Sequence, residues 1–409
     1  MNTRRRWIQS LLAGAALAPW VRLSVAAPAS PNNSNRFVFV VLRGGMDGLT
    51  AAPVPGDPAF AAARGVLADF SDFGTAPLPL AGPFTLHPLL PQLQAMYGAR
   101  ELTVVHAVGL PYRERSHFDA QQVLESGGSR PYELTSGWLG RAVAASGRGG
   151  AAPGLRAVAL ETAVPLVLRG PAEVDTWSPS ALAEPSGDLV ARLALMYRGD
   201  AALSGALQRA RGLRGEPGSI ANPSANPSTA TQAAAGPKRS AAVTLAAKAA
   251  EFLQSGSQVA VLDMAGWDSH ANQGTAGGAT SNNLRALDAS LAALREGLLP
   301  NGLWAQTVVV VATEFGREVS VNGTHGTDHG SGGVAFVVGG AVAGGRVLAD
   351  WPGLATKDRY EGRDLRITTD LRTVLRNVLG EHLQVSRSAL DRDVLPGSAA
   401  LPRLQLLRT

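Results

Sequence analysis

Five short runs of apolar residues recur along the chain, and each is ended by glycine or by polar residues. The first, Arg36–Leu42, reads Arg-Phe-Val-Phe-Val-Val-Leu and stops at Gly44-Gly45. The others are Leu102–Val108, Gln258–Met264, Thr307–Ala312 and Val334–Val338. Short apolar runs without polar alternation are typical of strands covered on both faces, as in a parallel sheet.

Segments with the apolar spacing of helices lie between these runs. They are Leu89–Tyr97, His117–Ser126, Leu189–Leu213, Ala241–Leu253, Leu284–Leu299 and Leu371–Leu379. Strands that alternate with helices predict an α/β fold with a mostly parallel sheet.

One stretch, Gly215–Lys238, breaks the alternation because it is rich in Gly, Pro, Ser, Ala and Asn and has no apolar period. This composition predicts a flexible surface insertion. The insertion divides a single domain, residues 36–385, into parts at about 36–214 and 239–385. Residues 386–409 are predicted to be a tail that wraps around the domain or frays.

The N-terminus, residues 1–27, has the order of a secretory signal. Thr3–Ile8 places an arginine pair before bulky apolar residues, Leu11–Pro19 is apolar, and Ser24–Ala27 offers small residues for cleavage. The arginine pair favours the twin-arginine variant, so the twin-arginine translocase is the predicted partner during export. An ordinary secretory signal is the first alternative. An uncleaved membrane anchor is the second, although Arg22 interrupts the apolar stretch. The predicted location is periplasmic or extracellular.

Removal of that segment changes the charge of the protein. The formal charge of +5 falls by four, to +1, because residues 1–27 carry four arginines and no acid. A nearly neutral mature chain without a basic run excludes a nucleic-acid-binding role. The absence of cysteine excludes disulfides, thiolate metal sites and cysteine nucleophiles. No later stretch is apolar enough for a stable membrane anchor.

Histidines and acids gather in short glycine-rich motifs that follow predicted strands. Because ligands bind at the carboxyl ends of parallel strands, the loops there are expected to converge. Several carboxylates in one cleft repel each other unless a cation neutralises them. A site of imidazole and carboxylate ligands suits zinc, manganese or iron. In a site for two ions, the half with mostly oxygen ligands suits magnesium or calcium. The candidate metal residues are Asp47, Asp268, His270, Glu314, Asp328 and His329. Two ions held there would promote displacement at phosphorus or sulfur.

Plainer interpretations apply to single residues. For Asp47, the plainer interpretation is that it caps the N-terminus of a helix and binds no metal. His325 is either a further imidazole or a turn residue, and a turn is favoured. His87 is expected to cap or pack, His106 to be a satisfied core histidine, and His382 to be structural.

The segment Arg113–Asp119 offers a different chemistry. Ser116 is a candidate N-cap for the helix that starts at His117. The same position makes its hydroxyl a candidate nucleophile, because a helix N-terminus stabilises an oxyanion. Arg113, Arg115 and Arg317 are candidate residues for binding the anionic group of a small ester substrate.

Five motifs in this order resemble a bacterial exported family known as domain of unknown function 1501. They are Arg43–Gly48, Ser116–Gln121, Gly266–His270, Thr313–Arg317 and Gly326–Gly330. The resemblance extends over residues 36–380 and places the chain near the alkaline phosphatase-like superfamily. It implies an α/β/α sandwich with a site for two divalent metals. Asp47, Asp268, His270 and His329 resemble its metal ligands, whereas Glu314-Phe315 departs from the usual Asp-His pair.

The resemblance gives no substrate. Formylglycine sulfatases are disfavoured, since the chain has no cysteine and no Ser-x-Pro-x-Arg motif. The leading hypothesis is an exported, metal-dependent hydrolase of phosphate or sulfate esters, with Zn, Mn, Mg or Ca as the metal. The alternative is a non-catalytic binding or assembly protein on the same fold. A calcium-stabilised structural site is a further hypothesis.

Overall fold

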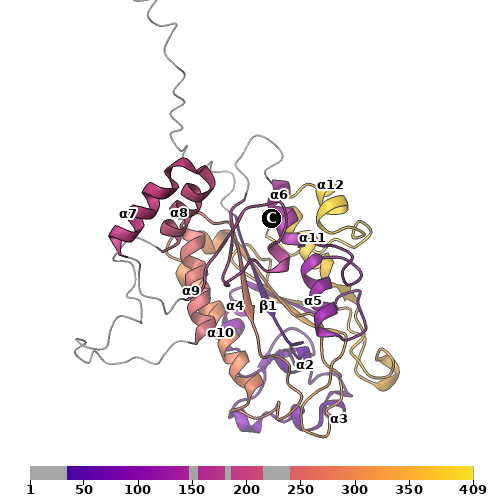
Figure 1. Ribbon diagram of the computed structural model, residues 1–409. Helices are drawn as coiled ribbons and strands as arrows, with labels where there is room; N and C mark the ends of the chain where they lie inside the picture. Colours follow the sequence, from indigo (N-terminus) through magenta and orange to yellow (C-terminus); the bar gives the residue numbers. More distant parts are fainter. Residues whose placement is uncertain (1–34, 147–154, 180–185, 215–239, 409) are drawn as a thin grey trace, which may run out of the picture. The chain divides into compact units, whose positions relative to one another are not determined.

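The computed structural model describes residues 35–146, 155–179, 186–214 and 240–408 (Figure 1). The predicted signal segment, residues 1–27, and the predicted insertion, residues 215–238, lie outside these ranges. Ser34–Thr409 forms one compact unit. Within the described ranges, no helix has the length and apolar character needed to cross a membrane.

A nine-stranded sheet forms the centre of this unit. Eight strands follow the order β10-β4-β9-β8-β1-β7-β5-β6, and β11 also pairs with β4. The strands are β1 (Arg36–Leu42), β4 (Leu102–Gly109), β5 (Ala157–Ala159), β6 (Val174–Thr176), β7 (Val259–Met264), β8 (Thr307–Ala312), β9 (Gly333–Val338), β10 (Arg346–Leu348) and β11 (Thr369–Asp370). Because β7 lies between β1 and β5, the segments before and after residues 215–238 share one sheet.

Most neighbouring strands are parallel, as predicted, but β9 is antiparallel to both β4 and β8. The sequence alone did not reveal this reversal, because a strand buried on both faces has the same apolar composition in either direction. The reversal matters for the site. The loop that ends at Gly333 precedes β9, and it therefore lies at the sheet edge where β1, β7 and β8 end.

Helices cover both faces of the sheet and confirm the three-layer α/β/α arrangement. On one face, α4 (Pro91–Gly98), α9 (Ala241–Gln254) and α10 (Ala279–Leu298) pack on alternate strand residues such as Val38 and Val40. On the other face, α5 (His117–Ser126), α6 (Trp138–Ser146) and α11 (Leu371–Glu381) pack on the remaining ones, such as Phe37 and Phe39.

The other helices are short or peripheral. They are α2 (Gly48–Ala51), α3 (Phe60–Arg64), α7 (Gly187–Met196), α8 (Ala201–Arg214) and α12 (Arg387–Ala389). A two-stranded antiparallel sheet joins β2 (Leu78–Pro79) and β3 (Thr85–Leu86).

Three local expectations need correction or completion. The single helix expected over Leu189–Leu213 is wrong, because Gly199 breaks it and the Asp200 carboxylate accepts the Leu203 N–H to start α8. The sequence does not predict the short strands β5 and β6, since three-residue strands carry little periodic signal. Helix α6 is also missing from the prediction. The tail wraps, because side chains such as Leu395 and Leu406 are fully buried.

Candidate metal centre

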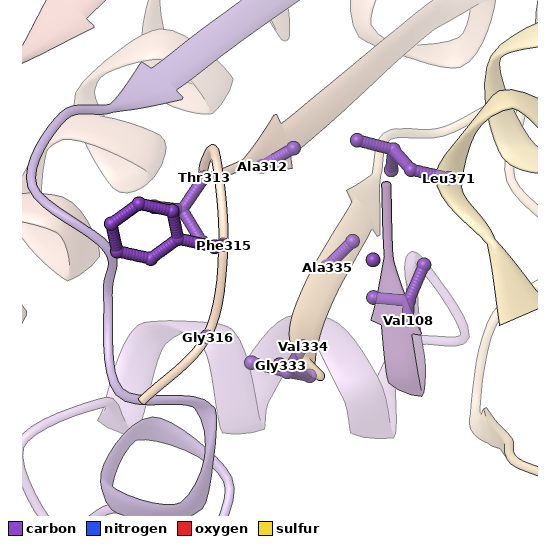
Figure 2. Close-up of a pocket in the computed structure, with 10 residues that line it drawn as sticks. Val108, Ala312, Thr313, Phe315, Gly316, Gly333, Val334, Ala335 and Leu371 are labelled. Carbon is purple, nitrogen blue, oxygen red and sulfur yellow. The ribbon is translucent and has the colours of Figure 1, made fainter. Parts of the chain in front are cut away.

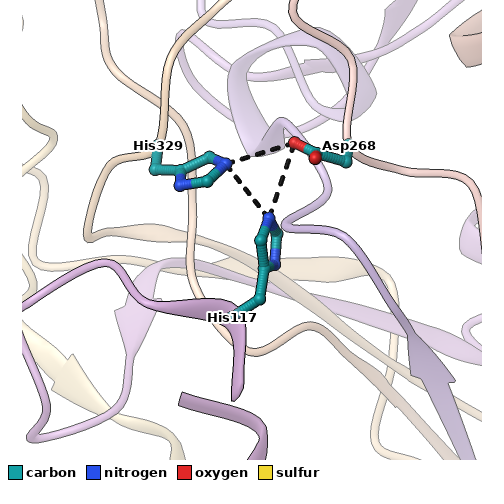
Figure 3. A group of neighbouring side chains, drawn as sticks. All are labelled: His117, Asp268 and His329. Atoms are coloured by element: carbon teal, nitrogen blue, oxygen red, sulfur yellow. Dashed lines mark hydrogen bonds and ion pairs between the residues drawn. The ribbon is translucent and has the colours of Figure 1, made fainter. Parts of the chain in front are cut away.

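Three side chains from distant parts of the chain meet at the carboxyl edge of the sheet: His117, Asp268 and His329 (Figure 3). His117 begins α5, Asp268 follows β7, and His329 lies in the loop before β9. The two Nε2 atoms of His117 and His329 are 3.0 Å apart. Asp268 Oδ1 lies 3.2 Å from His329 Nε2 and 3.5 Å from His117 Nε2. We call these three residues and His270 the histidine cluster.

His270 adds a fourth donor atom from the same loop as Asp268. Its Nε2 lies 3.1 Å from His329 Nε2 and 3.0 Å from Asp268 Oδ1. Three imidazole Nε2 atoms therefore lie within 3.5 Å of one carboxylate oxygen, Asp268 Oδ1.

Each imidazole of the cluster is held by its other nitrogen, Nδ1. His117 Nδ1 lies 2.8 Å from Glu314 Oε1, and His270 Nδ1 lies 3.0 Å from Asp328 Oδ1. His329 Nδ1 lies 3.1 Å from the carbonyl oxygen of Arg115. Carboxylate and carbonyl oxygens only accept hydrogen bonds, so each Nδ1 carries the hydrogen. The Nε2 lone pairs of the neutral rings then point at one another.

A proton or a metal cation between the facing atoms would stabilise this arrangement. Lone pairs on nitrogens 3.0 Å apart repel each other, and the Asp268 carboxylate adds a negative charge. Metal-bound histidines characteristically donate their second N–H to a carboxylate or a carbonyl, and all three rings do so here. The donor set therefore fits a divalent metal ion that prefers imidazole, such as zinc or manganese.

The pKa shifts in the cluster agree with a cation site. Partial burial opposes ionisation of Asp268, but the hydrogen bond and charge of Arg317 hold its pKa at about 2. The hydrogen bond to Glu314 raises the pKa of His117, whereas burial and the nearby His117 lower the pKa of His329. Because a metal competes with the proton on His117, metal affinity should fall as the pH is lowered.

Arg317 ties the loops of the cluster together and does not face a substrate. Its side chain is completely buried, and it donates to Asp268 Oδ1 at 2.5 Å. Its other acceptors are backbone carbonyls of Gly44, Gly45, Trp267 and Thr327. The predicted substrate-binding role of Arg317 does not fit this burial, since its side chain is not accessible to a ligand.

Gly44 lets the loop after β1 approach the cluster closely. A Cβ at this position would lie 2.4 Å from the Asp268 nitrogen, and its φ of +118° is one that other residues rarely adopt. Its N–H donates to Glu314 Oε1 at 2.9 Å. The glycines of this motif therefore serve the close packing of loops.

Asp47, predicted as a metal ligand, is not brought into the cluster. It is 3% exposed, it caps α2 by accepting from Leu49 and Thr50, and it pairs with the buried Arg64. Burial disfavours its charge, but the Arg64 guanidinium outweighs this effect and lowers the pKa of Asp47. Gln273 also donates to it. The N-cap interpretation fits, because an arginine already supplies the cation that a carboxylate needs.

The remaining predicted residues divide into two groups. Glu314 and Asp328 lie behind the histidine rings and orient them. Ser116 is the N-cap residue of α5, but its side chain makes no capping bond. Arg113 donates to the Leu110 carbonyl, and Arg115 pairs with Asp364 and Glu361. Neither guanidinium is directed at the cluster by these bonds.

A family model matches the chain, and it is the model of the family that the five sequence motifs resemble. Residues 97–394 match the family described as protein of unknown function (DUF1501). The chain belongs to the DUF1501 family. The matched segment contains all four residues of the histidine cluster, whereas Asp47 lies before it. No curated protein matches this DUF1501 chain by sequence.

Several solved structures are similar to the DUF1501 chain at low identity. The phosphonate monoester hydrolase of Agrobacterium radiobacter is 11% identical, with 76% of this chain and 70% of that one covered and a TM-score of 0.33. The lipoteichoic acid synthase LtaP from Listeria monocytogenes is 11% identical over 78% and 67%, with a TM-score of 0.32. BT1596, a 2-O GAG sulfatase, is 11% identical over 90% and 73%, with a TM-score of 0.40. Activity must therefore be argued from the cluster itself.

His117 is the cluster residue that the sequence reasoning missed. From the sequence alone it is only the first residue of a predicted helix. The available signal was its spacing, because His117, Gln121 and Glu125 lie at i, i+4 and i+8 on one face of α5. His117 and Gln121 both bond Glu314, and Glu125 bonds Arg43 at the end of β1.

The other histidines of this DUF1501 chain have the roles predicted for them. His87 accepts the Leu89 N–H, and His106 Nε2 lies 2.8 Å from the Ala52 carbonyl. His382 Nε2 lies 2.9 Å from the Arg36 carbonyl. His325 has a φ of 59° in an exposed turn.

A small pocket near the cluster is lined by side chains that cannot take part in acid-base or metal chemistry. Its lining includes Val108, Ala312, Phe315, Val334 and Leu371 (Figure 2). None of its lining residues carries an ionisable side chain. The Phe315 ring also packs against His117, with ring centroids 4.7 Å apart. The pocket is therefore a gap in the apolar support of the site.

A second group of charges lies at the ends of β1, β5 and β7 and predicts a pH effect. Arg43 pairs with Glu125 and Asp263, and burial followed by the charge of Asp263 raises the pKa of Glu161 from 4.5 to about 7. The stability that depends on protonated Glu161 is complete below its unfolded pKa and is lost as the pH rises through about 7.

The substitution Glu161→Gln removes this titration. The variant and the wild type should have similar melting temperatures at pH 5, and the variant should melt higher at pH 8. Calorimetry between pH 5 and pH 9 measures the difference, with Glu296→Gln, a change at an exposed glutamate of α10, as the control. Parallel curves for wild type and Glu161→Gln would show that Glu161 ionises normally.

Proposed function

We propose that this protein is an exported, metal-dependent hydrolase of phosphate or sulfate esters. The observation that carries the proposal is the convergence of three imidazole Nε2 atoms on one carboxylate oxygen, with every Nδ1 bonded to an oxygen acceptor. Facing lone pairs do not stabilise the fold by themselves, so a cluster built in this way is better explained by a cation that binds between them.

His117, His270, His329 and Asp268 would hold the metal ion. The ion would polarise an ester oxygen and increase the acidity of bound water. Zinc or manganese is favoured over calcium or magnesium, because the donor set is rich in nitrogen and the latter prefer oxygen. This choice narrows the four metals expected from the sequence and argues against a calcium-stabilised site.

Ser116 is proposed as the nucleophile because it precedes the ligand His117 at the N-terminus of α5. Its side chain leaves the first-turn N–H groups of α5 uncapped, so they are available to an oxyanion. The three predicted arginines already pair with protein groups, so the anionic group of the substrate would bind to the ion and these N–H groups.

A second candidate function has one observation in its favour. The cluster offers four donor residues, as many as a tetrahedral zinc site uses, and such closed sites are usually structural. The protein would then be a non-catalytic binding or assembly protein with a metal-stabilised fold. In that case the metal would raise the melting temperature but no ester would be hydrolysed.

Activity assays separate the two candidates. The mature protein, loaded with Zn²⁺ or Mn²⁺, is assayed on aryl phosphate, aryl phosphodiester and aryl sulfate esters. The hydrolase proposal expects turnover of at least one ester, lost with chelator and with Ser116→Ala. Tight metal binding without turnover on any ester would favour the structural alternative.

Export is proposed from the order of residues 1–27. The double substitution Arg4→Lys with Arg5→Lys should leave the protein in the cytoplasm if the twin-arginine translocase carries it. Normal export of the double variant would point to the ordinary secretory route.

A further inference from the structure

We infer that Arg115 is a positioning residue that sets the spacing between His117 and His329; this inference rests on the proposed metal centre. Arg115 lies two residues before His117 in the chain. Its carbonyl oxygen lies 3.1 Å from His329 Nδ1. Arg115 is therefore linked to His117 through two peptide bonds and orients His329 through a hydrogen bond.

The backbone of Arg115 is held in a conformation that arginine does not favour. Its φ is 60°, in the left-handed region where a side chain crowds the following carbonyl. Such residues persist only where the surroundings hold them, and they concentrate at functional sites. The conformation of Arg115 directs its carbonyl at the His329 ring.

Two carboxylates supply the hold on the Arg115 side chain. Its Nε donates to Asp364 at 2.8 Å and its Nη2 donates to Glu361 at 2.7 Å. Asp364 is fully buried and is itself fixed, because Ser331 donates to it at 2.8 Å and Arg363 at 3.1 Å. Arg363 also donates to the His329 carbonyl at 2.9 Å. Asp364 is the anchor of the Arg115 side chain. It is linked to the loop of His329 through Arg363 as well as through Arg115.

Loss of the anchor has a specific consequence. Without the pair to Asp364, residue 115 relaxes toward negative φ, and its carbonyl turns away from His329 Nδ1. His329 then loses the acceptor that keeps the hydrogen on Nδ1, and Ser116-His117 shifts with the peptide. Removal of such outer partners of a metal ligand typically weakens metal binding by about 10- to 100-fold.

The same contacts distinguish this role from substrate binding. The Arg115 guanidinium faces Asp364 and Glu361, and a substrate anion would have to displace both. Arg115 acts through His329 and His117, so its substitution should change the affinity for the metal itself, before any ester is added.

The test measures Zn²⁺ and Mn²⁺ affinity by competition with a chromogenic chelator, using the full-length mature protein. Arg115→Ala removes the anchor but keeps the Cβ that disfavours a φ of 60°. Arg115→Gly removes the anchor where glycine adopts that φ without strain. Arg115→Lys keeps one donor for Asp364, and Glu361→Gln removes only the exposed partner. We expect affinity about 10- to 100-fold weaker for Arg115→Ala, intermediate values for Arg115→Gly and Arg115→Lys, and the wild-type value for Glu361→Gln. The melting temperature in chelator should fall somewhat for the Arg115 variants, because the buried Asp364 loses one of its two arginine partners, and should not change for Glu361→Gln.

Equal affinity of wild type and Arg115→Ala would overturn the inference. So would a lower melting temperature in chelator with unchanged affinity, since that pattern belongs to a merely structural residue. A wild type that binds neither metal contradicts the proposed centre itself, so the two failures are distinguishable.

Discussion

Replacement of His117 by alanine should abolish ester hydrolysis and weaken metal binding by at least roughly 100-fold, because it removes a donor atom and not only an outer partner. The Nε2 of His117 lies 3.0 Å from His329 Nε2, and no other described side chain is positioned to replace it. Metal affinity is measured by chelator competition and hydrolysis by release of the aryl group.

A matched control is His325→Asn. His325 is a neighbouring exposed histidine outside the cluster, and asparagine tolerates its φ of 59°. This variant should keep the metal and the activity of the wild type. Retention of full metal affinity by His117→Ala would exclude His117 from the centre.

Replacement of Arg317 by methionine should lower the free energy of unfolding by about 3–5 kcal/mol, mainly because several buried carbonyls lose their hydrogen-bond donor at once. The substitution leaves four buried carbonyls without their donor and leaves the Asp268 carboxylate without its guanidinium. Methionine fills much of the volume, so the loss reports on hydrogen bonds and charge more than on a cavity. Denaturant unfolding of the metal-free protein measures it.

The control for Arg317 is Arg192→Met, a change at an arginine that is 72% exposed on α7. Its effect should stay within about 0.5 kcal/mol. A destabilisation of Arg317→Met no larger than that of Arg192→Met would contradict the view that Arg317 ties the loops together.

The fold was largely predictable because its strands are buried on both faces. Runs such as Arg36–Leu42 and Thr307–Ala312 became strands with the predicted bounds. The direction of β9 was not predictable, since its apolar composition is the same in a parallel or an antiparallel neighbourhood. The break between α7 and α8 was missed because the apolar period continues across Gly199-Asp200, while a local cap decides the outcome.

The candidate site was predictable where residue type and position agreed. Asp268, His270 and His329 were found because histidines and acids share short glycine-rich loops at one sheet edge. Asp47 fits the same pattern, but a distant residue, Arg64, supplies its cation. His117 and the inward direction of Arg317 depend on contacts between loops far apart in sequence, and no local pattern specifies them.

Metal content tests the central claim most directly. The wild-type protein, purified without chelator and analysed by mass spectrometry for metals, should contain close to one zinc or manganese ion per chain. The double variant Asp268→Ala with His270→Ala should contain almost none while keeping its secondary structure by circular dichroism. A metal-free wild type that cannot be loaded with Zn²⁺ or Mn²⁺, or a double variant that retains the full metal content, would contradict a metal centre at the histidine cluster.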